Sequence, residues 1–412
     1  MPEFFNVLPP SQALAVLLER LPHGVVAGSE TVPIAEALGR LTAEAIYSPE
    51  DLPAFPRSTV DGFSVRASDT HGASEGLPAY FTVVGEVPMG KSAEVSVSAG
   101  EAAITYTGGM LARNANAVIM MENTQRVDVS TIEVVRPVAA GENVIEVGED
   151  VRKEEEVLPA GHLLRAQDLG GLTALGISQI KVVRQLRAAI LSMGDEVVAP
   201  DTVPGPGQIR DVNTYTISGL VHQAGAEPVP LGLVGDDYEE QLAAARAGLE
   251  QADVLVFSAG SSVSSRDLTA DIINNLGQPG VLVHGLSLRP GKPAIVGLVG
   301  GKPAFGLPGN PVSAVIVFDL LVRPTLYHLA GCTRLPPPPT ITARLSQNIA
   351  SAPGREDYVP VKLTERDGNR VAEPVFGKSN LIFTLIRADG LVKVPLDKAG
   401  LYAGEEANVR LF

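Results

Sequence analysis

The chain has 412 residues, of which 45% are hydrophobic and only 5% aromatic, and this length and composition predict about two to four domains of aliphatic α/β type. Its formal net charge of −15 repels nucleic acid and anionic membranes, so an anionic ligand would need a pocket that is locally basic or lined by amides. The single cysteine, Cys332, excludes an intramolecular disulfide and a thiolate metal cluster, and it fits a reducing compartment such as the cytoplasm.

The first half of the chain changes character twice. Leucines at helical spacing predict a helix over residues 9–21, with Ser11 as its N-cap. Short β-branched runs separated by Gly, Ser and Asn predict a small antiparallel β-domain over residues 48–138. Helical spacing then returns over residues 165–175 and ends at Gly176, because glycine favours the left-handed conformation that follows many helices.

The clearest pattern runs from residue 184 to residue 330, where apolar runs alternate with helical segments. Such alternation predicts βαβ units around a mostly parallel sheet, whose ligands bind at the carboxyl ends of the strands. The prolines of residues 336–339 predict a stiff extended linker. The remaining residues predict a second small β-domain.

A stretch rich in Gly and Pro, residues 289–314, leads into the last apolar helix of this region. Its segment "FGLPGNPVS" predicts a strand-to-helix turn whose amides and helix dipole face one anionic group. Arg289 and Lys292 would bring positive charge to the same place. The residues expected to bind the anion are Pro308, Gly309, Asn310, Pro311 and Ser313. The alternative is a tight turn that only packs.

A second loop, "VLVFSAGSSVSSRD" at residues 254–267, predicts a strand, a run of small residues and a helix that carries Asp267. The hydroxyls of Ser258 and Ser262 and the amide of Gly260 could hold phosphate oxygens. No P-loop or dinucleotide-binding motif is present, however, so an ordinary turn remains the alternative.

Acidic residues follow several of these predicted elements. Glu196 and Asp236 each follow a predicted strand, while Asp61 and Asp150 lie in turns nearer the N-terminus. Carboxylates at the ends of parallel strands, beside an anion pocket, are what Mg²⁺ requires when it bridges to phosphate. The alternative for each is a solvated turn or a helix N-cap, above all for Asp236 and Asp267, which precede predicted helices.

Other chemistries lack a motif. The six histidines are scattered, with no His-x-His or His-Glu-x-x-His spacing for a zinc or iron centre, and no Gly-x-Ser-x-Gly elbow occurs. The first residues do not form a secretion signal, and no apolar run reaches the length of a membrane span. The residues alone therefore predict a cytoplasmic α/β protein with flanking β-domains that binds a phosphorylated small molecule with Mg²⁺.

Ordered motifs over nearly the whole length give the chain a family resemblance. They include "PAFPRSTVDGFSV", "GENVIEVGEDV", "ILSMGDEV", "GQIRDVNTYTISGLV", "GLPGNPVSAVIVF" and "GKSNLIFTLIRADGLVKVP". With them the chain resembles the molybdopterin molybdenumtransferases of the MoeA type, and it is similar to the C-terminal domain of gephyrin.

The resemblance implies a homodimer of four-domain subunits and a reaction. The family takes adenylylated molybdopterin, cleaves its pyrophosphate linkage in a Mg²⁺-dependent step and inserts molybdate, releasing AMP. Partners among other cofactor-biosynthesis proteins stay open. The implied domains are a discontinuous N-terminal domain (1–47 and 140–183), an inserted β-domain (48–139), an α/β molybdopterin-binding domain (184–332) and a C-terminal β-barrel (333–412).

The resemblance also assigns roles to residues of this chain. Asp236 and Asp267 would hold the metal and the pterin phosphate, Arg289 and Lys292 would meet the oxyanion, and Glu196 would lie on the pterin side. The resemblance also implies that Asp61, Thr107 and Asp150 are functional residues, because they match functional positions of the family. Asp61 and Thr107 would reach the cleft from the β-domain of the partner subunit.

The chain departs from the family pattern at several positions. It has "SAGSSVS" where the family has a loop richer in glycine, Arg289 where lysine is usual, and Gly285 where another lysine is common. Two alternative functions follow. One is a catalytically impaired member that binds pterin or nucleotide, or acts as a scaffold, and the other is a nucleotide-pyrophosphate hydrolase.

Overall fold

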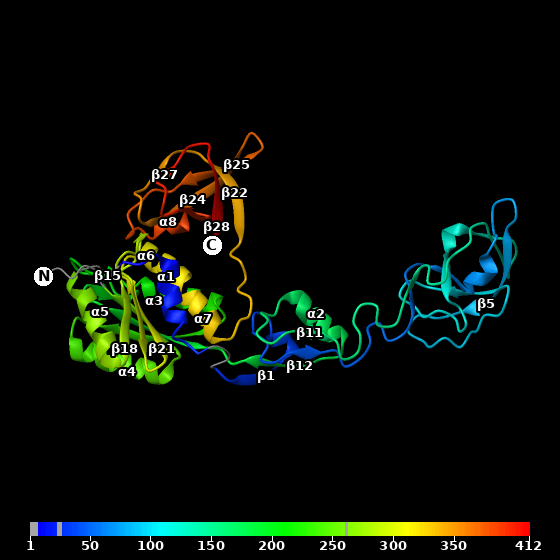
Figure 1. Cartoon of the computed structure of the whole chain (residues 1–412), viewed down its shortest axis with the longest axis horizontal. Coiled ribbons are helices and arrows are strands. Elements are labelled where there is room, and N and C mark those ends of the chain that lie inside the picture. The colour runs from blue at the N-terminus through cyan, green and yellow to red at the C-terminus, as the bar shows by residue number, and fades with distance from the viewer. Residues whose placement is uncertain (1–6, 23–26, 260–262) are drawn as a thin grey trace. The chain divides into compact units, whose positions relative to one another are not determined.

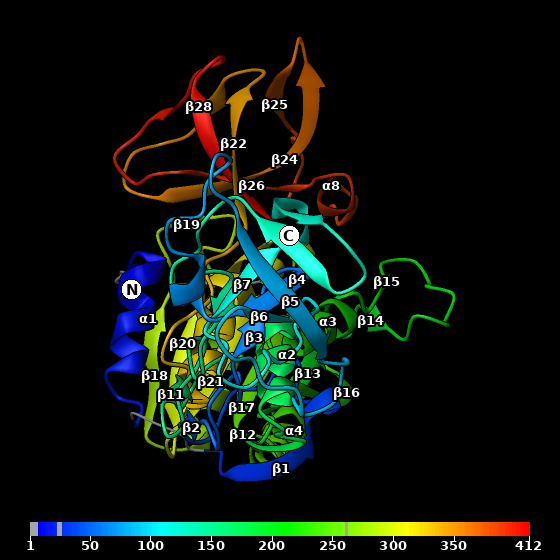
Figure 2. The same cartoon turned by 90° about the vertical axis from the view of Figure 1, so that its right-hand side faces the viewer.

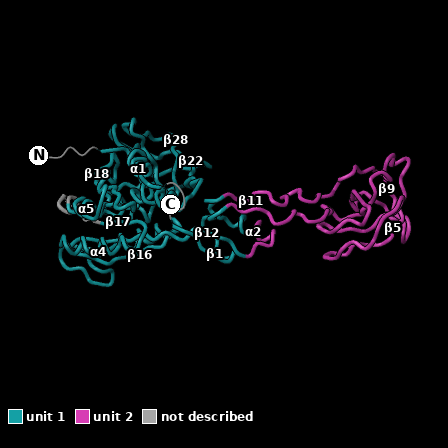
Figure 3. Tube along the Cα trace, turned by 60° about the horizontal axis from the view of Figure 1, so that its bottom comes forward, with its two compact units in different colours: residues 1–44, 160–169, 179–412 teal, residues 45–159, 170–178 magenta. Residues whose placement is uncertain are grey.

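The computed structural model describes residues 7–22, 27–259 and 263–412 of the chain. The chain divides into two compact units, coloured separately in Figure 3. The larger unit comprises residues 1–44, 160–169 and 179–412, and the smaller unit comprises residues 45–159 and 170–178. The division into four domains at the boundaries given above stays a prediction.

The centre of the larger unit is a six-stranded sheet with the order β16-β13-β17-β21-β20-β18. Neighbouring strands from β16 to β21 are parallel, and β20 alone runs against its neighbours, which confirms the prediction of a mostly parallel sheet. In sheet order the strands are β16 (Glu227–Val234), β13 (Arg187–Met193), β17 (Val254–Ala259), β21 (Lys302–Pro308), β20 (Ile295–Val299) and β18 (Pro279–His284).

Helices cover both faces of this sheet (Figure 1). Along β13, Ala188 and Ile190 belong to one hydrophobic cluster and Ala189 and Leu191 to another, because successive side chains of a strand point to opposite faces. The first cluster includes residues of α1, α3 and α6, and the second includes residues of α4 and α5. The helices are α1 (Pro10–Leu18), α3 (Asn213–Gln223), α4 (Tyr238–Gln251), α5 (Val263–Leu276) and α6 (Pro311–Val317).

One long apolar helix crosses the core of the larger unit. It runs through α6, a π-helical turn η4 (Phe318–Val322) and α7 (Arg323–Leu329). By length and composition alone residues 311–329 could span a membrane, but 67% of the segment is buried inside the protein. The helix therefore has the burial of a core helix.

The C-terminal β-domain is a closed barrel, seen at the top of Figure 2. Its strands pair in the order β24-β25-β22-β28-β26, and β26 pairs back onto β24. A short strand from the α/β region, β19 (Leu288–Arg289), adds to β24 in parallel. The barrel strands are β22 (Thr340–Leu345), β24 (Glu356–Arg366), β25 (Asn369–Pro374), β26 (Gly390–Val394) and β28 (Glu406–Leu411), with α8 (Phe383–Ile386) and the pair β23 (Ile349–Ala350) and β27 (Gly400–Leu401) beside them.

The smaller unit contains its own six-stranded sheet, with the order β7-β4-β6-β5-β9-β8. All neighbours are antiparallel except β5 and β6. Residues 93–99 precede β6 and form only an isolated bridge, between Ser96 and Arg113. The strands are β4 (Gly62–Val65), β5 (Ala79–Glu86), β6 (Glu101–Thr105), β7 (Ala117–Met120), β8 (Thr124–Arg126) and β9 (Thr131–Val134), with the short pairs β2 (Ile46–Tyr47) with β11 (Glu156–Leu158) and β3 (Arg57–Ser58) with β10 (Val144–Ile145).

Both predicted helices of this part of the chain form, but α1 ends at Leu18, short of the predicted range 9–21, and its predicted cap is wrong. The helix α1 begins at Pro10 after Pro9, so Ser11 lies inside its first turn and is not the N-cap. Proline suits this position because the first amides of a helix have no intrahelical acceptor. The helix α2 (Ala166–Ala174) ends as predicted, and Gly176 follows it with a φ of 74°.

We expect Gly62 and Gly171 to respond in opposite ways to substitution by alanine. A Cβ at Gly62 would lie 1.9 Å from the carbonyl oxygen of Ile119, whereas a Cβ at Gly171 would have no atom within 4 Å. Gly62→Ala should therefore destabilise the smaller unit by about 1–3 kcal/mol or more. Gly171→Ala should stabilise α2 by about 0.5–1 kcal/mol. Differential scanning calorimetry measures both, and a wild-type transition in Gly62→Ala would contradict the packing.

Candidate functional site

The carboxyl ends of four parallel strands bring several predicted residues to one edge of the sheet. Asp236 follows β16, Glu196 follows β13, Ser258 lies near the end of β17 and Pro308 ends β21. The register pairs Met193 with Val234, Ser192 with Ser258, and Ser258 with Leu307, so these strand ends are neighbours. This is the edge at which parallel sheets bind ligands.

The predicted strand-to-helix turn forms at the end of β21. Asn310 occupies the N-cap position of α6 and Pro311 begins the helix, as expected. The turn is also held by the barrel: Asn310 Nδ2 donates to Ser379 Oγ at 3.0 Å, and the Val312 amide donates to the Ser379 carbonyl at 3.1 Å. One of the first-turn amides is thus used within the protein, and fewer remain for an anion than the sequence suggested.

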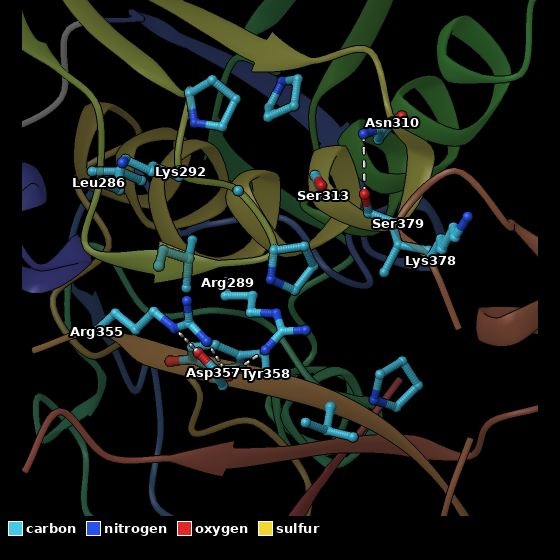
Figure 4. Close-up of a pocket in the computed structure, with 18 of the residues that line it drawn as sticks. Leu286, Arg289, Lys292, Asn310, Ser313, Arg355, Asp357, Tyr358, Lys378 and Ser379 are labelled. Carbon is cyan, nitrogen blue, oxygen red and sulfur yellow. Dashed lines mark hydrogen bonds and ion pairs between the residues drawn. The ribbon is translucent and has the colours of Figure 1, made fainter. Parts of the chain in front are cut away.

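A cavity of about 1210 Å³ opens between this turn and the barrel (Figure 4). Lys292 and Asn310 both line it, so the turn is not sealed in the hydrophobic interior. Cationic side chains come to it from both sides. Its polar lining includes Arg289, Lys292, Asn310 and Ser313 from the α/β region, and Arg355, Asp357, Lys378 and Ser379 from the barrel.

None of these four barrel residues was predicted. Three of them, Arg355, Lys378 and Ser379, lie in loops. Each follows a glycine directly or within two residues in a loop, in the segments "GRED" and "GKSN". A basic residue in such a loop is a weak signal by itself. Only the folding of the barrel against the α/β region brings these loops to the cavity.

The cations of the cavity differ in how they are paired. Lys292 is exposed, and among the described residues its ammonium has no hydrogen bond or ion pair. Arg289 lies 3.6 Å from Asp357, and Arg355 donates to both oxygens of Asp357, at 2.9 and 3.4 Å. The cavity therefore offers a free point charge and two guanidinium groups that share one carboxylate.

Asn213, the first residue of α3, ties two strand ends together. It is 6% exposed, and its Nδ2 donates to Ser258 Oγ at 2.8 Å and to the Gly309 carbonyl at 2.9 Å. Because Ser258 is 3% exposed and already accepts this bond, its hydroxyl supports the turn from within. Gly260 and Ser262, predicted with Ser258 to hold phosphate, lie outside the described residues.

The structure separates the acidic residues by their local roles. Asp237, not Asp236, caps α4 by accepting the Glu240 amide at 2.9 Å, so the N-cap alternative for Asp236 is wrong. Asp236 is exposed, and its amide donates to Asp195 Oδ1 at 3.0 Å. Asp267 lies within α5 rather than before it, and its side chain lies outside the described residues.

The acids do not form a complete metal centre among the residues described. Within that part of the chain no group of three His, Cys, Asp or Glu side chains could hold a metal ion. Glu196 is half-buried, and its carbonyl accepts the Ile209 amide at 2.7 Å. This bond lies beside the paired strands β14 (Val197–Val198) and β15 (Ile209–Arg210), which project from the sheet in Figure 2. Neither Glu196 nor Asp236 is among the described residues that line the cavity.

In the smaller unit, Asp61 and Thr107 form a direct pair. The amide and the hydroxyl of Thr107 both donate to Asp61 Oδ1, at 2.8 and 2.9 Å. Both bonds hold the pKa of Asp61 below its ordinary value, and the bond from the Thr107 amide has the larger effect. Asp150 is an exposed turn residue whose amide donates to the Leu52 carbonyl at 3.1 Å.

Comparisons with known proteins cover almost the whole chain. Family models match residues 8–176 (MoeA N-terminal region, domains I and II), 189–328 (probable molybdopterin binding domain) and 342–412 (MoeA C-terminal region, domain IV). A molybdopterin molybdenumtransferase of Haemophilus influenzae is 32% identical, over 97% of this chain and 98% of that protein. The chain belongs to the MoeA family. This membership confirms the resemblance read from the motifs.

Further relatives agree with this assignment. A molybdopterin molybdenumtransferase of Nostoc sp. is 31% identical over 92% of this chain and 88% of its own length. A crystal structure of the molybdopterin biosynthesis MoeA protein from Pyrococcus horikoshii OT3 superposes with a TM-score of 0.85, at 31% identity, covering 99% of this chain and 100% of that chain. The predicted multidomain α/β fold with flanking β-domains is therefore confirmed. The prediction that the chain is an enzyme of molybdenum cofactor biosynthesis is confirmed at the level of the family.

We expect Asn213→Asp to destabilise the turn of this MoeA-family protein. The substitution places a carboxylate oxygen where the buried Asn213 Nδ2 donates to the half-buried Gly309 carbonyl, so two acceptors would face each other. The expected loss is about 1–3 kcal/mol in the free energy of unfolding, measured by urea denaturation. Asn275→Asp is the control, because exposed Asn275 also donates to a carbonyl, that of Asp271, but water can replace it. Equal effects of the two substitutions would contradict the role of Asn213.

We expect Thr107→Val to raise the pKa of Asp61. The hydroxyl bond stabilises the ionised carboxylate, and its loss favours the protonated form, although the amide bond of Thr107 remains. At a fixed mildly acidic pH, the ionised fraction of Asp61 should therefore fall. Carbon-13 NMR titration of the Asp61 carboxyl measures this change. Thr107→Ser, which keeps the hydroxyl, should titrate like the wild type, and a pKa in Thr107→Val at or below the wild-type value would contradict the assignment.

Proposed function

We propose that this chain inserts molybdate into adenylylated molybdopterin and releases AMP, as the molybdopterin molybdenumtransferase reaction requires. One observation carries the proposal: Arg289, Lys292, Arg355 and Lys378 line a single cavity beside the strand-to-helix turn, on a chain with a net charge of −15. Basic groups gathered at one place on an acidic protein indicate an anionic ligand. Membership of the MoeA family supplies the identity of that ligand.

The cavity suits two kinds of anion. Molybdate is a tetrahedral dianion, and the phosphate groups of the adenylylated pterin present similar oxygens. Guanidinium groups offer paired donors to such oxygens, whereas the ammonium of Lys292 offers a compact charge. Cleavage of the pyrophosphate linkage increases negative charge on the phosphoryl oxygens, and positioned cations lower the barrier by stabilising that charge.

We assign magnesium to Asp236 and Asp267 at the carboxyl edge of the sheet. Asp236 fits this role: it is exposed, and among the described residues its carboxylate has no partner. Mg²⁺ commonly takes one or two carboxylates, keeps several waters and binds substrate phosphates. When bound, the ion would supply positive charge next to the phosphates. Glu196 would then contact the pterin side of the substrate.

We further propose a cytoplasmic homodimer in which the smaller unit contributes to the partner's site. The support is the pairing of Asp61 with Thr107, which keeps an ionised carboxylate in a fixed place on an exposed loop. Asp150 would belong to the same contribution. No nucleic acid or membrane enters the proposed reaction.

Mixed dimers test the sharing of residues between subunits. Asp61→Ala and Lys292→Ala should each be inactive as homodimers. After random subunit exchange, half of the dimers would be mixed and one site in two of these would be intact, so about a quarter of the wild-type activity should return. Activity that stays absent after exchange, although native mass spectrometry detects mixed dimers, would show that the residues do not act across subunits.

The reaction itself is tested with adenylylated molybdopterin and Mg²⁺, with and without molybdate, by following AMP. Wild-type protein should release AMP faster with molybdate, and Lys292→Ala should lose about 10²–10³-fold in rate because a charge facing the oxyanion is removed. Lys362→Ala is the matched control, since Lys362 is an exposed barrel lysine outside the residues described around the cavity. Release that ignores molybdate, or turnover of adenylates that lack the pterin, would favour the alternative of a pyrophosphate hydrolase.

A further inference from the structure

A short parallel strand pair joins the α/β region to the barrel beside the cavity. The strand β19 pairs with β24, with Leu288 opposite Glu356 and Arg289 opposite Asp357, and the Glu356 amide donates to the Ser287 carbonyl at 2.9 Å. The backbone therefore sets Arg289 and Asp357 at matching positions on two different domains. Both residues line the cavity.

Asp357 is almost completely buried and lies between two arginines. It is 3% exposed. Its Oδ1 accepts from Arg355 Nε at 2.9 Å, while Oδ2 lies 3.4 Å from Arg355 Nη2 and 3.6 Å from Arg289 Nη1. Figure 4 shows the three side chains together at one wall of the cavity. A buried carboxylate in this setting requires its cationic partners, and it restrains them in return.

The two arginines remain accessible although they are restrained. Their side chains are 61% exposed for Arg289 and 36% for Arg355. Each guanidinium has five N–H donors, and Asp357 occupies only part of them. Two guanidinium groups without a shared counter-ion would repel each other, so the carboxylate also allows them to stand close together.

We propose that Asp357 is a positioning residue that holds Arg289 and Arg355 in a fixed arrangement for a tetrahedral oxyanion. This inference rests on the proposed function, which supplies molybdate as that anion. Asp357 itself does not touch the anion, because its oxygens face the arginines. Side chains that fix the orientation of ligand-binding groups reduce the entropy lost when the ligand binds.

The neighbouring acid gives a contrast within the same strand. Glu356 is also buried, at 7% exposed, and also forms an ion pair, with Lys393 Nζ at 2.6 Å. It accepts from the hydroxyl of Tyr358 at 3.3 Å and is not among the described residues that line the cavity. Glu356→Gln therefore removes a buried charge of the same strand without altering the arginine pair.

A purely electrostatic role for Asp357 would change anion affinity in the opposite direction. If Asp357 only neutralised the cavity, its removal would increase the positive potential and anions would bind more tightly. If it positions the arginines, its removal frees them and anions bind more weakly. The sign of the change in affinity therefore distinguishes the two roles.

The test compares Asp357→Asn with Glu356→Gln in the full-length protein. Molybdate affinity is measured by isothermal titration calorimetry, and the KM for molybdate and kcat by AMP release. Asp357→Asn should raise both the Kd and the KM about 10-fold or more, with kcat changed far less, as for loss of a group that orients ligand-binding residues. Glu356→Gln should leave the Kd and the KM near wild type even if it lowers the melting temperature.

Further variants keep the test decisive if Asp357→Asn folds poorly. Arg355→Lys keeps the buried carboxylate but loses the paired donation, and it should weaken molybdate binding in the same way. In an Arg355→Ala background, Asp357→Asn should add much less than its single effect. Unchanged or tighter binding by Asp357→Asn overturns this inference alone, whereas wild-type protein that binds no molybdate overturns the proposed function together with it.

Discussion

The parallel arrangement of β16, β13, β17 and β21 is the constraint on which the site depends. Parallel strands end at one edge, so residues from four distant segments of the sequence become neighbours there. The edge alone would leave a flexible loop after β21. Asn213 fixes that loop from the α/β side and Ser379 fixes it from the barrel, so both domains must fold before the turn is held in place.

The same dependence explains why a strongly acidic protein can offer an anion site. The net charge is spread over the whole surface and is screened by salt over about 8–10 Å, whereas the cations of the cavity act at contact distance. Arg355 and Lys378 reach the cavity from the barrel, and Arg289 and Lys292 reach it from the α/β region. Neither region by itself would provide all four charges.

Much of the fold and part of the site could be predicted from local sequence. Alternation of apolar and helical segments predicted the parallel sheet, and the turn around Asn310 with Lys292 beside it could be predicted because the signals lie within about twenty residues. Arg355 and Ser379 could not, because closure of the barrel brings them to the turn. Where two adjacent residues could take the same role, the sequence did not show which one would: Asp237 rather than Asp236 caps α4.

Arg289 shows how a departure from the family pattern can agree with the rest of a site. A lysine at this position would place a single ammonium opposite Asp357, whereas the longer, planar guanidinium can share that carboxylate with Arg355 and keep donors for a ligand. Nearby Gly285 has a φ of 100°, a conformation that is strained for a lysine, so the backbone there does not favour the cation that the family commonly carries. The positive charge of the site has therefore to come from Lys292 and the arginine pair, and the geometry of that pair depends on one buried carboxylate of the barrel.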